Sequence, residues 1–225
     1  MTLLNEPDLQ RFVFNHVDWA FYEDVSRRLE GRHVFVTYYK GKLEVVTTSL
    51  LHERIAALLY RLLCILSEET GTPTVTAGRA TLRDLVLDEG VEADTSFYFH
   101  ANAKRMEGKQ EIDLKVDPPP DLAVEVEVTR RLGERRMIYR DLGVQELWRY
   151  ADGTVTVLVR RGDDYVSIKQ SPTFPLVSLA DVSSWIRAGI RQDETTWTIG
   201  VRKRVRDAMA TKAGGRKKAP RKRGR

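Results

Sequence analysis

Hydrophobic residues recur at helical spacing between residues 52 and 69, which gives the chain its clearest regular element. The residues at this spacing are Ile55, Leu58, Leu59, Leu62, Leu63 and Leu66. Steps of three and four residues place them on one face of an α-helix. Ser49 is suited to cap the start of the helix, and Gly71 follows as a stop signal. The pattern therefore predicts a long amphipathic helix with one buried face.

A period of two marks two strands that carry acidic residues. After Pro118–Pro120, one face of the first strand carries Leu122, Val124, Val126 and Val128, and the other carries Asp121, Ala123, Glu125 and Glu127. Residues 90–99 alternate in the same way, with Glu92 and Asp94 on one face. Buried strands usually carry apolar residues on both faces. The carboxylates therefore mark either a solvated sheet face or a functional site.

Shorter patterns complete the expected order of elements. Residues 33–38 and 43–47 predict an N-terminal β-hairpin that turns at Lys40–Gly41, and residues 7–30 are expected to be helical in part. Further strands are expected at 74–76, 80–82, 146–150, 155–160 and 165–169, helices at 131–142 and 179–188, and a loop at 104–115. From residue 52 to 150 the order is helix, three strands, helix, strand, which predicts a mixed α/β sandwich.

Charge is distributed unevenly along the chain, with an excess of basic residues at the C-terminus. Of the 37 Lys and Arg residues, 12 lie in residues 201–225 beside one acid, Asp207, so this segment carries +11. The other 25 basic and 31 acidic residues give residues 1–200 a charge of −6. We expect a folded domain over residues 1–200 and a disordered basic tail over residues 201–225.

The tail is the candidate nucleic-acid-binding segment, because a dense cationic tract gains free energy by releasing counterions from DNA. Its candidate contacts are Arg216, Lys217, Lys218, Arg221, Lys222 and Arg223. The alternative is a solubilising extension without a ligand.

Composition narrows the class of protein. The hydrophobic content of 42% and the charged content of 31% are ordinary for a globular domain. One cysteine, Cys64, excludes an internal disulfide, and the four histidines lack zinc-site spacing. Residues 1–10 do not resemble a signal peptide, and no apolar run is long enough to span a membrane. We expect a cytoplasmic protein of bacterial type, with no membrane partner.

Asp94 and Glu125 are the first candidates for chemistry. If their strands pair about 4.8 Å apart, the two side chains can converge. Mg²⁺ is usually held by one or two carboxylates together with water and phosphate oxygens. Glu127 points the same way as Glu125, about 7 Å along the strand. Acids so placed are stable if they are solvated, paired with cations or bound to a metal.

Several short motifs occur in a fixed order along the chain. They are Gly41–Val46, His52–Ile55, Gly90–Asp94, Pro119–Val126, and Tyr139 with Gly143–Trp148. Over roughly residues 30–188 the chain resembles the PD-(D/E)XK nuclease superfamily, and more closely the Uma-two family of restriction-endonuclease-like proteins. The resemblance implies a restriction-endonuclease-like mixed sheet flanked by helices in the order α-β-β-β-α-β. It also implies that Asp94 and Glu125 bind Mg²⁺ or Mn²⁺ and that DNA is the substrate.

Two departures from the superfamily pattern bear on catalysis. A lysine often lies two residues after the glutamate, where this chain has Glu127. Family members tend to carry a lysine one turn before the tyrosine, where this chain has Arg135, with Arg136 beside it. A guanidinium stays protonated, so Arg135 is suited to stabilise transition-state charge rather than to act as a base. Glu127 would orient or deprotonate the attacking water.

Glu44 and Glu53 are candidate accessory carboxylates, since the superfamily often adds an acid from the first helix, although Glu53 also suits an ordinary helix N-terminus. The leading hypothesis is a Mg²⁺-dependent DNA endonuclease that hydrolyses phosphodiester bonds, with a homodimer as one form of assembly. The alternative is a catalytically inactive nucleic-acid-binding or protein-interaction module on the same fold. A carboxylate-pair hydrolase acting on sugars needs two acids across a cleft, which residues of one strand supply poorly.

Overall fold

The computed structural model describes residues 10–128 and 133–216, which form two β-sheets and their flanking helices. One sheet contains β1 (Arg11–Asn15), β2 (Val34–Tyr39), β3 (Lys42–Thr47), β5 (Thr81–Asp84) and β6 (Glu89–Glu92). The other contains β4 (Thr74–Gly78), β7 (Thr95–Phe99), β8 (Leu122–Glu127), β9 (Glu146–Ala151), β10 (Thr154–Arg161) and β11 (Asp164–Ile168). The helices are α1 (Trp19–Leu29), α2 (Leu50–Thr70), α3 (His100–Met106), α4 (Arg135–Asp141), α5 (Leu179–Gly189) and α6 (Glu194–Arg216).

The six-stranded sheet contains the predicted nuclease-like core. Its strand order is β11-β10-β9-β8-β7-β4, with β8 and β9 parallel and the other neighbours antiparallel. Along the chain, α2, β4, β7, β8, α4 and β9 follow one another in the expected α-β-β-β-α-β order. The expected restriction-endonuclease-like fold is therefore confirmed. The hairpin β5–β6 is inserted after β4 and joins the five-stranded sheet instead.

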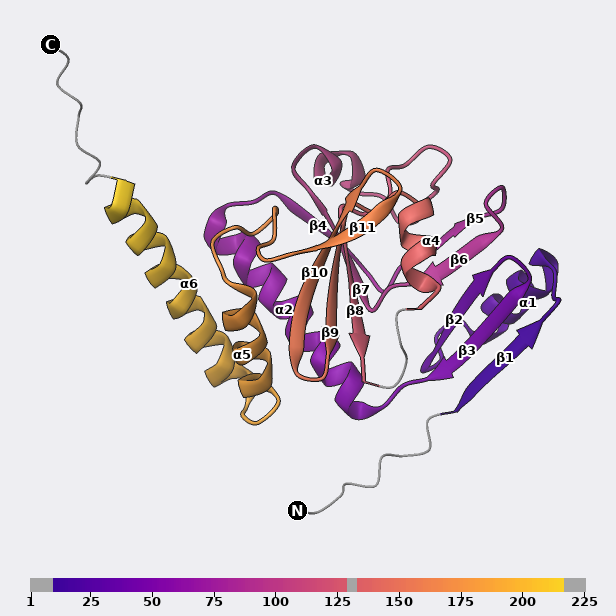
Figure 1. Ribbon diagram of the computed structural model, residues 1–225, viewed down its shortest axis with the longest axis horizontal. Coiled ribbons are helices and arrows are strands. Elements are labelled where there is room, and N and C mark those ends of the chain that lie inside the picture. Colours follow the sequence, from indigo (N-terminus) through magenta and orange to yellow (C-terminus); the bar gives the residue numbers. More distant parts are fainter. Residues whose placement is uncertain (1–9, 129–132, 217–225) are drawn as a thin grey trace, which may run out of the picture.

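Two apolar layers bury the central strand β8 on both faces. On one face, Val124 and Val126 pack with α2, α5 and α6 in the largest cluster of buried residues. On the other face, Ala123 packs with Ile138 and Tyr139 of α4. Figure 1 shows α2, α5 and α6 toward one end of the molecule and the five-stranded sheet at the other. Glu125 and Glu127 therefore do not lie on a solvated sheet face.

The long helix α2 forms as its sequence predicts. The Ser49 side chain accepts the backbone N–H of His52 at 3.2 Å and caps the first turn. Gly71 ends the helix in the left-handed conformation with φ of 66°, which costs a residue without Cβ little. The predicted apolar face is buried, with Leu58, Leu62 and Leu66 at 0% exposure.

The expected single strand over residues 90–99 is wrong. The chain leaves the five-stranded sheet at the end of β6 and enters the six-stranded sheet at the start of β7, with Ala93 and Asp94 in between. Side-chain alternation continues through the break, so the sequence pattern does not reveal that two sheets share the segment.

Other boundaries also differ from the expectations. Residues 7–30 were expected to be helical in part: Trp19–Leu29 form α1, while residues 11–15 form the edge strand β1, which pairs with β3. The expected loop at 104–115 begins with the last turn of α3. Within the expected helix at 131–142, α4 starts at Arg135, and residues 129–132 lie outside the described part of the chain.

The helix α6 continues into the segment expected to be a tail. Trp197, Val201 and Val205 are at most 1% exposed and belong to the same core as α2. Residue 200 therefore falls inside a packed helix. The predicted tail contacts Lys217, Lys218, Arg221, Lys222 and Arg223 lie outside the described residues, and Arg216 is described only as the last helical position. None of the helices described is both long and apolar enough to cross a bilayer.

Candidate active site

Asp94 lies where the chain passes between the two sheets, and its hydrogen bonds hold it against β8. Its backbone N–H donates to the carbonyl of Val124 at 3.1 Å. Its carboxylate Oδ2 accepts the backbone N–H of Val126 at 2.6 Å, and the side chain is 0% exposed. Since Val124 and Val126 flank Glu125, these bonds bring the two predicted acids beside each other.

Glu125 projects from β8 beneath α4 and is fully buried. Its Oε1 accepts hydrogen bonds from the guanidinium of Arg135 and the hydroxyl of Tyr139. Burying a carboxylate is costly unless it is paired and hydrogen-bonded. Arg135 and Tyr139 lie one helical turn apart, so a single helix supplies both partners.

Arg135 connects the two acids electrostatically. It is 4% exposed, and Nη2 also donates to the backbone carbonyl of Glu92 at 3.3 Å. Burial by itself lowers the pKa of Arg135, but Glu125, Tyr139 and Asp94 favour the charged form and raise that pKa above its ordinary value. Within the described residues, Nε and Nη1 of Arg135 are buried without a hydrogen-bond partner. Nε carries one hydrogen and Nη1 carries two, so three N–H bonds of this guanidinium have no acceptor among the described residues.

His52 joins this cluster, although the sequence alone did not assign it a role. The residue is 1% exposed at the start of α2, and its Nε2 lies 3.3 Å from Oδ1 of Asp94. Its Nδ1 lies 3.6 Å from Oε1 of Glu53, and the neighbouring His52 lowers the pKa of Glu53. The sequence did contain one indication of this position. His52 follows the predicted cap residue Ser49 by three residues, so it lies in the first turn of the helix.

The other predicted site residues have partners of their own. Glu127 forms a bidentate ion pair with Arg149 of β9, with both contacts at 2.6 Å. Glu44 pairs with Arg11 at 2.8 Å in the five-stranded sheet. Arg136 donates to Asp164 at 2.5 Å at the start of β11. Of the predicted accessory residues, Glu53 lies near the acid pair because His52 contacts both Glu53 and Asp94. Arg136 is directed toward β11 instead.

The acid pair suits a hard divalent cation by its chemistry. Between residues 10 and 128 and between 133 and 216, no three or more His, Cys, Asp or Glu side chains gather in a metal-binding group. A Mg²⁺ ion, however, commonly uses only one or two carboxylates and completes its shell with water and phosphate oxygens. Asp94 and Glu125 are two carboxylates of the kind that this smaller requirement calls for.

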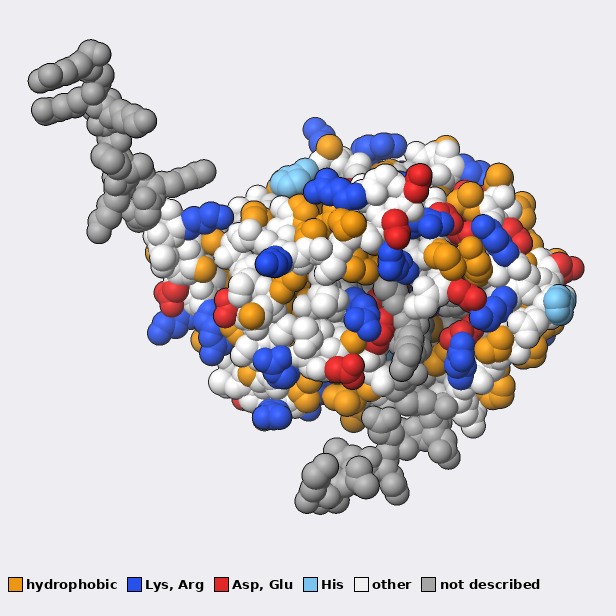
Figure 2. Space-filling view, in the orientation of Figure 1, with side chains coloured by type: hydrophobic (Ala, Val, Ile, Leu, Met, Phe, Trp, Pro, Cys, Tyr) orange, Lys and Arg blue, Asp and Glu red, His pale blue; other side chains and the backbone are white. Residues whose placement is uncertain are grey.

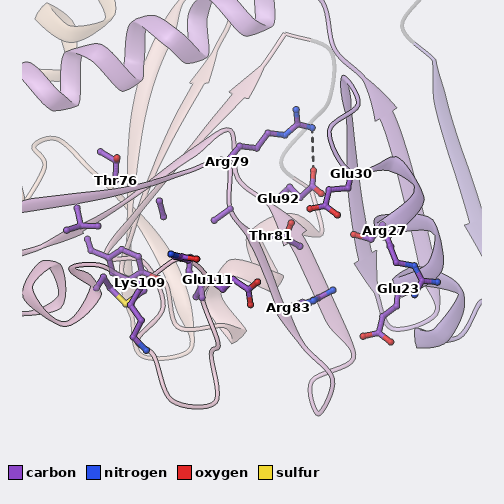
Figure 3. A pocket seen from close by; sticks show the side chains of 18 residues that line it. Glu23, Arg27, Glu30, Thr76, Arg79, Thr81, Arg83, Glu92, Lys109 and Glu111 are labelled. Carbon is purple, nitrogen blue, oxygen red and sulfur yellow. Dashed lines mark hydrogen bonds and ion pairs between the residues drawn. The ribbon is translucent and has the colours of Figure 1, made fainter.

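A cavity of about 730 Å³ lies between α1, the β4–β5 turn and the segment after α3, and one of its lining residues is Glu92, whose backbone carbonyl accepts a hydrogen bond from Arg135. Figure 3 shows Arg79 and Glu92 in its wall, joined by an ion pair at 3.4 Å. Arg27, Arg83 and Lys109 also line the cavity, as do Glu23, Glu30 and Glu111. Charges of both signs therefore surround it, which does not favour a polyanion in the cavity itself.

The fold and the buried acid pair define a restriction-endonuclease-like protein. Residues 19–189 match the model of the Uma2 family, whose description is "putative restriction endonuclease". The match spans most of the chain, so the protein belongs to the Uma2 family, and the predicted resemblance is confirmed. A search of the curated proteins gives no match. Membership places the protein in a nuclease-like class.

Proposed function

We propose that the protein is a divalent-metal-dependent endonuclease that hydrolyses phosphodiester bonds in DNA. The observation that carries the proposal is the meeting of Asp94, Glu125 and Arg135 in a family of nuclease-like proteins. Two acids and one guanidinium supply both the oxygen ligands for a cation and a positive charge for a phosphate.

Asp94, Glu125 and a backbone carbonyl near Val126 would hold Mg²⁺ or Mn²⁺. The bound ion supplies Lewis acidity toward the phosphate and lowers the pKa of water. The bond from Val126 N–H to Asp94 Oδ2 fixes the orientation of that carboxylate before any ligand arrives. Preorganised ligands of this kind reduce the reorganisation needed during reaction.

Arg135 is proposed to bind the phosphate and to offset charge that develops in the transition state. Its buried N–H groups act in a medium of low dielectric, where a fixed charge has a larger effect than in water. Tyr139 keeps the Glu125 carboxylate directed toward Arg135. Glu127, whose two oxygens are held by Arg149, is proposed to orient the attacking water.

The basic segment beyond residue 200 is proposed to supply affinity for DNA. The face of the body in Figure 2 carries interspersed Lys, Arg, Asp and Glu side chains rather than a single basic patch. The excess of basic residues in 201–225 is therefore the main electrostatic attraction toward a polyanion. We further propose residues 1–200 as the endonuclease-like domain, completed by the buried part of α6, with a homodimer as one form of assembly.

One arrangement favours a second candidate function. The guanidinium of Arg135 already neutralises Glu125, and Arg149 neutralises Glu127. A site whose acids are satisfied by arginines suits a catalytically inactive module that binds nucleic acid or a protein through the same fold.

The deciding experiment is a cleavage assay on supercoiled and linear duplex DNA with Mg²⁺, with Mn²⁺ and with a chelator. Wild-type protein is expected to cut only with metal, and Asp94→Asn and Glu125→Gln are expected to abolish cutting. Asp207→Asn, which changes an exposed acid of α6, is the matched control. DNA binding without cleavage in wild-type protein under all conditions would favour the inactive module.

A further inference from the structure

Arg79 is held in place by three neighbours, although it lies in the turn between β4 and β5. Its guanidinium stacks on the ring of Phe35, with Cζ 3.6 Å from the ring centroid. It donates to the backbone carbonyl of Val34 and pairs with Glu92 at 3.4 Å. The Arg79–Glu92 pair is visible in the wall of the cavity in Figure 3. A surface arginine with this many contacts is fixed rather than free to sample solvent.

The contacts continue from Arg79 toward the acid pair. Phe35 of β2 is 2% exposed, and its ring lies edge-on to the ring of His52, with centroids 5.6 Å apart at 67°. The Nε2 atom of His52 lies 3.3 Å from Asp94. The four residues come from the β4–β5 turn, β2, α2 and the segment between β6 and β7, and form one column of side chains. Through His52, Phe35 of the five-stranded sheet is thereby linked to a proposed metal ligand.

We propose that Arg79 and Phe35 are positioning residues that hold His52 against Asp94 and so set the orientation of the Asp94 carboxylate. The inference rests on the proposed function, since it assigns a metal ligand to Asp94. The Val126 N–H donates to one carboxylate oxygen and His52 Nε2 lies 3.3 Å from the other, so a rotation of the His52 ring changes the surroundings that orient the Asp94 carboxylate. Groups that orient a metal ligand typically change metal affinity or activity by about 10–100-fold when removed.

Glu92 gives the column a second connection to the site. Its side chain pairs with Arg79, while its backbone carbonyl accepts Nη2 of Arg135. Displacing Arg79 is therefore expected to disturb both Glu92, two residues before Asp94, and the ring of Phe35 on which Arg79 stacks. The contact through Glu92 leads to Arg135, and the contact through Phe35 and His52 leads to Asp94. One substitution of Arg79 is therefore expected to make the positions of the two acids less well defined.

The test compares Arg79→Met with Arg83→Met in the full-length protein. Arg83 lines the same cavity but is not stacked on Phe35, so it is the matched control. Mn²⁺ affinity is measured by titration calorimetry, and the His52 ring signals are followed by NMR in metal-free protein. With four histidines, the His52 signals are assigned through a His52→Asn variant. Arg79→Met is expected to weaken Mn²⁺ about tenfold and to shift the His52 ring signals, whereas Arg83→Met does neither.

Two further variants separate positioning from general destabilisation. Arg79→Lys keeps a cation over the ring and is expected to recover part of the lost Mn²⁺ affinity. Phe35→Leu removes the ring and is expected to reproduce the shift of the His52 signals. In cleavage kinetics, Arg79→Met should lower kcat more than it raises KM.

Unchanged Mn²⁺ affinity in Arg79→Met would overturn the inference, whether or not the His52 signals move. Equal loss of affinity in Arg79→Met and Arg83→Met would also overturn it, because the effect would then follow charge at the cavity rather than the column. Failure of the wild-type protein itself to bind Mn²⁺ would refute the proposed function and this inference together. The wild-type titration thus distinguishes the two failures.

Discussion

The carboxylate of Glu125 is stable in the interior only because of its neighbours. Arg135 supplies the compensating charge and Tyr139 a second hydrogen bond, and all three residues are at most 4% exposed. Desolvation of such a pair is costly, so its net contribution to folding is small even when its geometry is good. Removal of one partner is a different matter, because the other charge is then left buried and unpaired.

We predict that Arg135→Met lowers the free energy of unfolding by about 3–5 kcal/mol, which is the range for breaking a buried ion pair on one side. The double variant Arg135→Met with Glu125→Gln should recover much of that loss, since no unpaired charge remains. Urea unfolding of both variants and of Glu125→Gln alone completes the cycle. A double variant as unstable as Arg135→Met would show that Arg135 stabilises the fold by packing rather than through Glu125.

Divalent metal should stabilise the protein through Asp94 and Glu125. If Mn²⁺ binds with submillimolar affinity, millimolar Mn²⁺ should raise the free energy of unfolding by on the order of 1–2 kcal/mol. Asp94→Asn should remove the resulting rise in melting temperature, whereas the exposed-acid control Asp207→Asn should keep it. Melting curves recorded with and without Mn²⁺ measure the difference. No rise in the wild-type protein would argue against a site of that affinity.

Two kinds of contact hold α6 against α2: buried apolar packing and ion pairs at the surface. Val201 and Val205 enter the core, while Arg206 and Arg202 bind Glu69 at 2.7 to 2.9 Å. The hydrogen bonds from Arg206 and Arg202 lower the pKa of Glu69. The helix carrying the basic segment is thus attached to the longest helix of the nuclease-like core.

This attachment should depend on pH. Because the folded-state pKa of Glu69 lies below its ordinary value of 4.5, the stabilisation is fully present above pH 4.5 and is lost as pH falls through the lower folded-state value. Glu69→Gln is expected to melt at a lower temperature than wild-type protein at pH 7, and the gap should narrow below pH 4.5. Glu111→Gln, at an exposed acid outside α2 and α6, provides the control. If the difference in melting temperature between wild-type protein and Glu69→Gln did not change with pH, the ion pairs of Glu69 would not be its cause.

Sequence periodicity predicted the elements that carry their own pattern. The helix α2, the hairpin β2–β3 and the strands β9 to β11 lie where spacing, caps and turns place them. The acids Asp94 and Glu125 were identified by their alternation and by the family motifs. The passage between sheets at residues 93–94 was not, since alternation is identical in one strand or two.

The site features that the sequence did not predict depend on contacts between elements that are distant along the chain. His52 is a functional candidate because it contacts Asp94, and Arg79 is one because Phe35 lies between it and His52. The sequence does not show that β2 approaches α2. Similarly, Glu127 binds Arg149 through the parallel pairing of β8 and β9, which requires the intervening α4 crossover.

The molecule as a whole combines an acidic body with a basic C-terminal segment. Residues 1–200 carry −6 and residues 201–225 carry +11, so the proposed attraction to DNA and the proposed chemistry reside in different parts of the chain. The buried residues of α6 decide how the two can be separated. A cut after residue 200 would remove Val201 and Val205 from the core, whereas a cut after Lys212 leaves both in place.

We therefore predict that the 1–212 fragment folds but binds DNA more weakly and with less salt dependence. The removed segment contains Arg216, Lys217, Lys218, Arg221, Lys222, Arg223 and Arg225 and no acid. The slope of log K against log salt should become shallower by up to about 6 if all seven engage phosphates. Sequence preference should survive, because phosphate contacts carry no base information. Fluorescence-anisotropy salt titrations of both proteins on one duplex make the comparison, with melting temperature as the folding control. Equal affinity and slope would identify the segment as a solubilising extension and move the search for a DNA surface to the body.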